Sequence, residues 1–261
     1  MNKLLFLFLA GIAMVSMSSG QVKTETVEYK QGDVVLQGYL SYDASVKGKR
    51  PAVLVIHDWL GVSDYTKMRA EQLAALGYVA LAADIYGKGV RPANGQEASA
   101  EAGKFYKDRS LLRARARAGL DFLASRPEAD PSRMATIGYC FGGAAALELA
   151  RSGAPVKGTV TFHGGLATPT PADAKNITGK VLVLHGADDP YTKQEDVTAF
   201  MKEMRDAGVD WQLVQYSGAV HSFTDKRAGN DNSKGAAYNA SADRRSWTAM
   251  RDFFAEIFPA Q

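Results

Sequence analysis

The only cysteine of the chain, Cys140, lies in a pattern that suits a nucleophile. It stands inside Gly138-Tyr139-Cys140-Phe141-Gly142-Gly143, between the short apolar run 134–137 and the alanine-rich run 144–150. A strand, a tight turn and a helix form the nucleophile elbow, and glycines let the neighbouring backbone approach. The helix would point its N-terminal end at the sulfur, which favours a thiolate. Because most free cysteines are small buried hydrophobes, the pattern also requires a base and an acid elsewhere.

Two aspartates are candidates for the acid. The apolar run 181–184 predicts a buried strand and leads directly into His185-Gly186-Ala187-Asp188-Asp189-Pro190. We favour Asp189, which is three residues past Gly186 and directly before Pro190, and keep Asp188 as the alternative. Either aspartate could instead form an Asx-turn or cap the following helix.

A histidine follows the next predicted strand. The alternating segment 211–216 leads into a loop that carries His221, ahead of a C-terminal helical segment. The chain order of nucleophile, acid and histidine is that of α/β-hydrolases. The sequence therefore predicts a catalytic triad of Cys140, His221 and Asp189.

Five segments spread over residues 25–258 together resemble the dienelactone hydrolase family of α/β-hydrolases. They are Ile56-His57-Asp58-Trp59-Leu60-Gly61, residues 77–87, the Gly138–Gly143 elbow, His185–Pro190 and His221-Ser222-Phe223. The resemblance implies a Cys-His-Asp triad and an acidic residue near the nucleophile. Asp58 matches the position of this acidic residue, although members of the family often have a glutamate there, which has a longer side chain. Some relatives carry an arginine for a substrate carboxylate. The stretch 100–106 has none, which argues against dienelactone itself as the substrate.

The order of apolar runs predicts one α/β domain over residues 21–261. We expect strands at 34–40, 52–56, 78–83, 134–137, 158–162, 181–184 and 211–216, and helices at 64–76, 96–123, 144–150, 192–207 and 242–257. Alternation of helices with apolar strands predicts a mostly parallel central sheet with helices on both faces, the α/β-hydrolase fold.

Ligands of such folds bind beyond the carboxyl ends of the strands. We expect the oxyanion hole to use the backbone N–H of Phe141 and one from the Asp58-Trp59 segment. Strand-end side chains that could contact substrate are Asp58, Trp59, Tyr86 and Phe223, with Phe141 beside them. Strand-end aromatic residues seal the core about as often as they line a pocket.

The first twenty residues predict a signal peptide. Lys3 is followed by twelve apolar or small residues, from Leu4 to Val15, and then by Ser16–Gly20. A positive start, a short apolar core and a small-residue cleavage zone are typical of export, and twelve residues are too few to span a bilayer comfortably. We expect an exported protein, periplasmic or secreted, with residues 21–261 as the mature chain.

Composition excludes several other classes. The formal charge of +3 implies neither a nucleic-acid partner nor, after signal cleavage, a membrane partner, and we expect a monomer. The basic stretch 109–117 is interpreted as the solvated face of an amphipathic helix. Without His-Glu-x-x-His, paired Cys-x-x-Cys or a dinucleotide glycine fingerprint, no metal or nucleotide cofactor is implied.

These residues predict acyl transfer on a small ester or lactone through a thioester on Cys140. A non-hydrolytic binding protein on a hydrolase scaffold is one alternative, and the complete triad argues against it. A thiol-based antioxidant protein is another, and the lack of a second cysteine argues against that.

Overall fold

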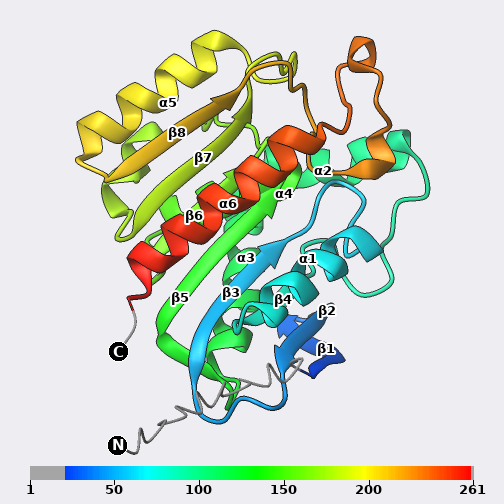
Figure 1. The fold of residues 1–261 in the computed structure, drawn as a ribbon, viewed down its shortest axis with the longest axis vertical. Helices are drawn as coiled ribbons and strands as arrows, with labels where there is room; N and C mark the ends of the chain where they lie inside the picture. Colours follow the sequence, from blue (N-terminus) through cyan, green and yellow to red (C-terminus); the bar gives the residue numbers. More distant parts are fainter. Residues whose placement is uncertain (1–20, 260–261) are drawn as a thin grey trace, which may run out of the picture.

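The computed structural model describes residues 21–259 (Figure 1). An eight-stranded sheet forms its centre, with the strand order β1-β2-β4-β3-β5-β6-β7-β8. Its strands are β1 (Val22–Gln31), β2 (Val34–Asp43), β3 (Arg50–Ile56), β4 (Val79–Ala83), β5 (Ala129–Tyr139), β6 (Gly158–Phe162), β7 (Lys180–Gly186) and β8 (Trp211–Tyr216). Strand β2 pairs antiparallel with β1 and β4, and the pairs from β4 through β8 are parallel. The mostly parallel α/β architecture is the one that the sequence predicts.

Helices cover both faces of this sheet (Figure 1). They are α1 (Asp64–Ala75), α2 (Gly95–Lys107), α3 (Arg109–Ala124), α4 (Phe141–Arg151), α5 (Gln194–Ala207) and α6 (Ala240–Ile257), with short 3₁₀ turns at η1 (Pro171–Asn176), η2 (Lys226–Ala228) and η3 (Asn232–Lys234). Helices α1 and α6 share one apolar core, whereas α3, α4 and α5 pack on the opposite face. Because β3 to β8 are parallel, the loops after them meet at one edge, where the candidate site lies.

Two details differ from the sequence-based expectation. The sheet begins at β1, a strand that the apolar pattern did not reveal because half of its residues are exposed and polar. The helix expected over 96–123 is two helices, since Asp108 leaves helical geometry and its carboxylate accepts from Leu111 N–H to cap α3.

The described helices include none long and apolar enough to cross a membrane. The predicted signal peptide lies outside the described residues.

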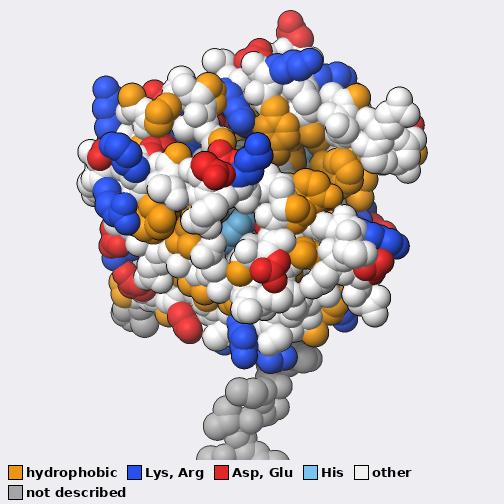
Figure 2. Space-filling model, turned by 90° about the horizontal axis from the view of Figure 1, so that it is seen from above, with side chains coloured by type: hydrophobic (Ala, Val, Ile, Leu, Met, Phe, Trp, Pro, Cys, Tyr) orange, Lys and Arg blue, Asp and Glu red, His pale blue; other side chains and the backbone are white. Residues whose placement is uncertain are grey.

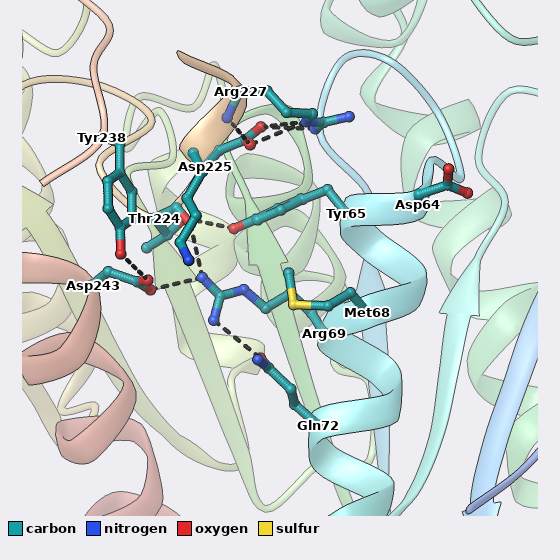
Figure 3. Close-up of a pocket in the computed structure, with 11 residues that line it drawn as sticks. Asp64, Tyr65, Met68, Arg69, Gln72, Thr224, Asp225, Arg227, Tyr238 and Asp243 are labelled. Atoms are coloured by element: carbon teal, nitrogen blue, oxygen red, sulfur yellow. Dashed lines mark hydrogen bonds and ion pairs between the residues drawn. The ribbon is translucent and has the colours of Figure 1, made fainter. Parts of the chain in front are cut away.

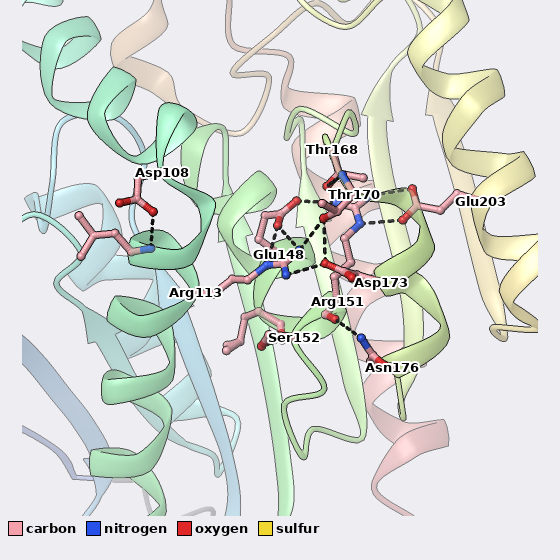
Figure 4. Close-up of polar contacts among 12 residues, drawn as sticks. Asp108, Arg113, Glu148, Arg151, Ser152, Thr168, Thr170, Asp173, Asn176 and Glu203 are labelled. Atoms are coloured by element: carbon pink, nitrogen blue, oxygen red, sulfur yellow. Dashed lines mark hydrogen bonds and ion pairs between the residues drawn. The ribbon is translucent and has the colours of Figure 1, made fainter.

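The basic stretch on α3 is not one solvated face, which corrects that interpretation. Arg115 is buried, and Arg113 turns inward to Glu148 and Asp173 at 2.8 and 2.7 Å. Figure 4 shows Arg113 joined to a buried network in which Arg151 forms two parallel bonds to Glu203. Arg113 turns inward because Glu148 on α4 is buried. A buried carboxylate needs a cationic partner, and α3 supplies one.

Candidate active site

Cys140 lies at the sharp turn between β5 and α4, with a backbone φ of +53°. A residue other than glycine rarely adopts positive φ, so this strain marks a position that the surrounding packing enforces. A Cβ on Gly142 would lie 2.2 Å from the Ile56 carbonyl oxygen, and one on Gly138 would lie 1.9 Å from the Gly142 oxygen. The flanking glycines therefore let the turn lie directly against the end of β3.

His221 and Asp189 meet beyond the ends of β8 and β7. The Nδ1 atom of His221 lies 2.8 Å from Asp189 Oδ2, and the Asp189 side chain is fully shielded from solvent. Its other oxygen accepts the backbone N–H of Tyr191, so both carboxylate oxygens are engaged. Asp188 is exposed, and its Oδ2 accepts the Gly218 N–H across the turn instead. Of the two candidate acids, Asp189 is the one that contacts the histidine.

The electrostatic environment of His221 favours its charged form. Burial alone would lower the pKa of the ring, but the Cys140 sulfur and Asp189 outweigh it and raise the pKa to about 10. These interactions favour the protonated form of the His221 ring. Asp189 holds Nδ1, which leaves Nε2 for the side of Cys140.

Cys140 and His221 open onto one cavity of about 310 Å³. Its lining is Trp59, Tyr106, Cys140, Gly165, Tyr191, Thr192, His221, Ser222 and Ala236. Figure 2 shows a single histidine in a hollow flanked by hydrophobic side chains, and His221 is the one histidine that is not buried. Of this lining, only Cys140, His221 and Trp59 were expected from the sequence. Tyr106 and Tyr191 come from a helix end and a loop, where no local pattern distinguishes a cavity wall from a surface.

Two backbone donors stand at the predicted oxyanion hole. Phe141 is the first residue of α4, and its N–H has no hydrogen-bond acceptor within residues 21–259. The Trp59 N–H likewise has no hydrogen-bond acceptor within residues 21–259, because Asp58 accepts the N–H groups of Leu60 and Gly61 instead. Gly142 packs against the His57 carbonyl, so the two segments adjoin.

Three side chains expected to contact substrate lie outside the cavity. Phe223 is fully buried between His163 and Tyr216, with ring centroids at 5.1 and 5.6 Å, and belongs to the core. Tyr86 is buried behind Trp59 and donates its hydroxyl to the Trp59 carbonyl. The positions of Phe223 and Tyr86 differ from the expectation, because both aromatic side chains pack into the core at the ends of their strands.

Asp58 is the third, and its carboxylate is engaged by a residue that the sequence reasoning missed. Arg227 donates to Asp58 Oδ2 at 2.8 Å and to Asp225 at 2.7 Å. Burial raises the pKa of Asp58, and the hydrogen bond from Leu60 and the Arg227 charge oppose that rise. The ion pair joins the loop after β3 to the loop after His221, a contact over 169 residues of sequence.

A buried polar network lies behind His221, and Figure 3 shows the part of it around Tyr65, Arg69 and Thr224. The Thr224 hydroxyl lies 2.6 Å from the Tyr65 hydroxyl and 2.7 Å from His163 Nε2, and the His163 ring packs edge-on against His221 at 5.2 Å. Arg69 on α1 donates to the Thr224 carbonyl at 2.8 Å and to Asp243 at 2.6 Å. Burial and the neighbouring His221 hold the pKa of His163 well below its usual value, so His163 is a neutral hydrogen-bonding partner. Within the described residues, no cluster of three or more His, Cys, Asp or Glu could hold a metal ion.

Comparisons with known proteins agree on one family. The model of the dienelactone hydrolase family matches residues 36–258. A crystal structure titled as a dienelactone hydrolase-like promiscuous phosphotriesterase from metagenomic libraries is 45% identical, with a TM-score of 0.87 over 91% of this chain and 99% of its own. A probable 2-oxo-3-(5-oxofuran-2-ylidene)propanoate lactonase of Bradyrhizobium sp. is 30% identical and covers 77% of this chain and 86% of its own. A putative carboxymethylenebutenolidase of Synechocystis sp. is 28% identical over 89% of this chain and 96% of its own.

Proposed function

The chain belongs to the dienelactone hydrolase family, and we propose that this hydrolase cleaves small esters or lactones through a thioester on Cys140. The observation that carries the proposal is the shared cavity of Cys140 and His221, with Asp189 bonded to the far nitrogen of the histidine. A nucleophile, a base and a group that orients the base are the three parts of a covalent acyl-transfer site.

In the proposed first half-reaction, Cys140 Sγ attacks the carbonyl carbon, and the carbonyl electron pair moves to oxygen. The N–H groups of Phe141 and Trp59 would stabilise that oxyanion. As the tetrahedral species collapses, the bond to the leaving alkoxide breaks and His221 Nε2 donates its proton to it. The products of this step are a thioester on Cys140 and a free alcohol, which in a lactone stays attached to the acyl group.

In the second half-reaction, neutral His221 accepts a proton from water while the water oxygen attacks the thioester carbon. Collapse expels the Cys140 thiolate and releases the carboxylic acid, which restores the imidazolium and thiolate pair. Asp189 accepts the hydrogen bond from Nδ1 throughout and stabilises the charged ring.

The test is turnover of 4-nitrophenyl acetate by the mature protein and by Cys140→Ala and His221→Ala. We expect each variant to lose roughly 10³-fold or more in kcat, as expected when a triad member is removed. Circular dichroism and urea unfolding establish that each variant is folded, and mass spectrometry of the quenched wild-type enzyme should show acylated Cys140. Wild-type rates in either folded variant would exclude this mechanism. No turnover by the wild-type enzyme with any ester would favour a binding protein, and turnover of peroxide instead would favour an antioxidant.

Neutral phosphotriesters are a second candidate substrate class. The specific support is the 45% identity, over nearly the whole domain, to a protein titled a promiscuous phosphotriesterase. An aryl dialkyl phosphate offers a phosphoryl oxygen to the same two N–H donors and a phenolate to the same imidazolium. Release of 4-nitrophenol from diethyl 4-nitrophenyl phosphate by the wild type, and its loss in Cys140→Ala, would support this activity.

Export remains a proposal that rests on residues 1–20 alone. Expression of the full chain followed by fractionation and N-terminal sequencing tests it. Recovery in an exported fraction with a new N-terminus near residue 21 is expected, and an intact N-terminus on cytoplasmic protein would exclude it.

A further inference from the structure

We propose that the cavity selects neutral aromatic esters and rejects esters whose acyl group carries a carboxylate. The inference deepens the proposed function, on which it rests, by naming the class of substrate. It depends on three observations: the side chains that line the cavity, the exposure of its aromatic residues, and the position of Arg109 and Arg227 outside the lining.

The lining holds no fixed cation. Apart from Cys140 and His221, every lining side chain is neutral. A carboxylate moved from water into such a site loses its hydration and gains no ion-pair partner. His221 is the only side chain of the lining that can carry a positive charge, and its Nδ1 atom is already bonded to the Asp189 carboxylate.

Aromatic residues form three parts of the cavity wall and are unusually exposed. Trp59 and Tyr106 each keep 40% of their surface exposed and Tyr191 keeps 63%, although most other aromatic residues of the fold are buried. Tyr191 also packs edge-on against the His221 ring at 5.2 Å. Apolar rings gathered around one hollow indicate a ligand that covers them, and an aromatic ring matches their shape and polarity.

Two arginines close to the site, Arg227 and Arg109, are not among the residues that line the cavity. Arg227 is bound to Asp58 and Asp225, and its guanidinium lies over the Tyr65 ring. Arg109 lies over the ring of Tyr106, 4.9 Å from its centroid, and is not part of the lining. The Nε and Nη1 atoms of Arg109 are buried and without a hydrogen-bond partner, so Arg109 is the residue that would have to move to hold an anion. The test therefore includes Arg109.

The decisive measurement compares two 4-nitrophenyl esters with the same leaving group. One is the ester of 4-methylphenylacetic acid and the other is the ester of 4-carboxyphenylacetic acid, which differs by a charge remote from the carbonyl. We expect wild-type kcat/KM to be roughly 10²-fold higher for the neutral ester, the size of penalty that an unpaired polar group produces. The methyl ester of the second compound is the size control and should be hydrolysed nearly as fast as the first.

A charge placed in the cavity should reverse this preference. Ala236 lines the cavity beside His221, so Ala236→Lys adds an ammonium and Ala236→Gln adds a neutral side chain of similar length. We expect the ratio of the two kcat/KM values to fall at least roughly tenfold in Ala236→Lys and to stay within about twofold of the wild type in Ala236→Gln.

Equal or greater kcat/KM for the carboxylate ester in the wild type would overturn the inference. If Arg109→Gln then abolished the preference for the anion, Arg109 would be the anion-binding residue. Failure of the proposed function is a separate result, because in that case neither ester would be hydrolysed in a Cys140-dependent way.

Discussion

Cys140 and His221 face one cavity, but different kinds of contact hold them in place. Cys140, the proposed nucleophile, is positioned by backbone packed against backbone, with Gly138, Gly142 and Gly143 leaving no room for a Cβ. His221 is positioned by side chains: Asp189 in front, and His163 with Thr224 behind. The side of the proposed nucleophile therefore depends on steric room, and the histidine side depends on hydrogen bonds.

This difference determines how a substitution on each side should affect stability and activity. Filling a close backbone contact displaces the turn and its oxyanion donors together, so both stability and activity are lost. Removing one hydrogen bond behind the histidine leaves the chain folded but lets the ring reorient, so activity falls more than stability does.

The largest effect is expected on the histidine side, at Asp189. Asp189→Asn keeps the shape of the side chain but can no longer stabilise the imidazolium, and kcat should fall by roughly 10⁴-fold. Asp188→Asn is the matched control, because Asp188 only accepts the Gly218 N–H. We expect this substitution to lower kcat by less than about threefold. Steady-state kinetics with 4-nitrophenyl acetate measures both. A greater loss in Asp188→Asn would transfer the acid role to Asp188.

On the nucleophile side, Gly142→Ala should destabilise the fold. The added Cβ would lie 2.2 Å from the Ile56 oxygen and 2.4 Å from the His57 oxygen, and neither backbone atom can move freely. We expect a loss of about 3 kcal/mol or more in the free energy of unfolding, or no soluble protein. Gly103→Ala on α2, where a Cβ meets nothing within 4 Å, should be neutral or stabilising. A Gly142→Ala protein with wild-type stability in urea would contradict the close-contact argument.

The same contrast explains what the sequence could predict. The elbow is a local motif, because the end of β5, the flanking glycines and α4 all lie within residues 134–151. The position of Asp189 follows from the end of β7, because parallel strands deliver their following loops to one edge. Chain order therefore predicted both the parallel sheet and which residues meet at its edge.

Several of the missed features depend on distant contacts. Thr224 and Tyr65 are 159 residues apart, Asp58 and Arg227 are 169 apart, and neither pair has a local signature. Trp59 and Phe223 both follow the ends of strands, but Trp59 is exposed and Phe223 is buried. Packing from α6 and β8 decides which of these aromatic side chains faces solvent. The basic stretch on α3 was misinterpreted for this reason, because Glu148 on another helix turns Arg113 inward.

A smaller effect is expected from Thr224→Val, which keeps the shape but removes the hydroxyl shared by His163 and Tyr65. Leaving these buried partners unsatisfied should cost about 1–3 kcal/mol of stability. Because His163 supports the His221 ring, kcat should also fall roughly tenfold while KM changes little. Thr224→Ser retains the hydroxyl and should restore kcat. A loss of stability with unchanged kcat would show that the network supports only the fold.

Cys140 and His221 also interact directly across the two sides. Burial lowers the pKa of the His221 ring, but the Cys140 sulfur and Asp189 raise it to about 10. A raised histidine pKa contributes stability that is complete below about pH 6.5 and is lost as pH rises through about 10. Cys140→Ala removes the largest influence that raises the His221 pKa, so this pKa should fall and the alkaline loss of stability should shrink.

Nuclear magnetic resonance of the imidazole rings can assign this titration without ambiguity. Burial lowers the pKa of His57 to about 4 and also lowers those of His163 and His185, so His221 is the only one of the four histidines with a raised pKa. In the wild type, one ring should therefore titrate near pH 10, and in Cys140→Ala that ring should titrate at least about one unit lower. Urea unfolding at pH 7 and pH 10.5 provides the matching stability difference between the two proteins. A ring that titrates near 6.5 in both proteins would mean that the resting site holds a neutral thiol and a neutral imidazole, with the two sides positioned independently.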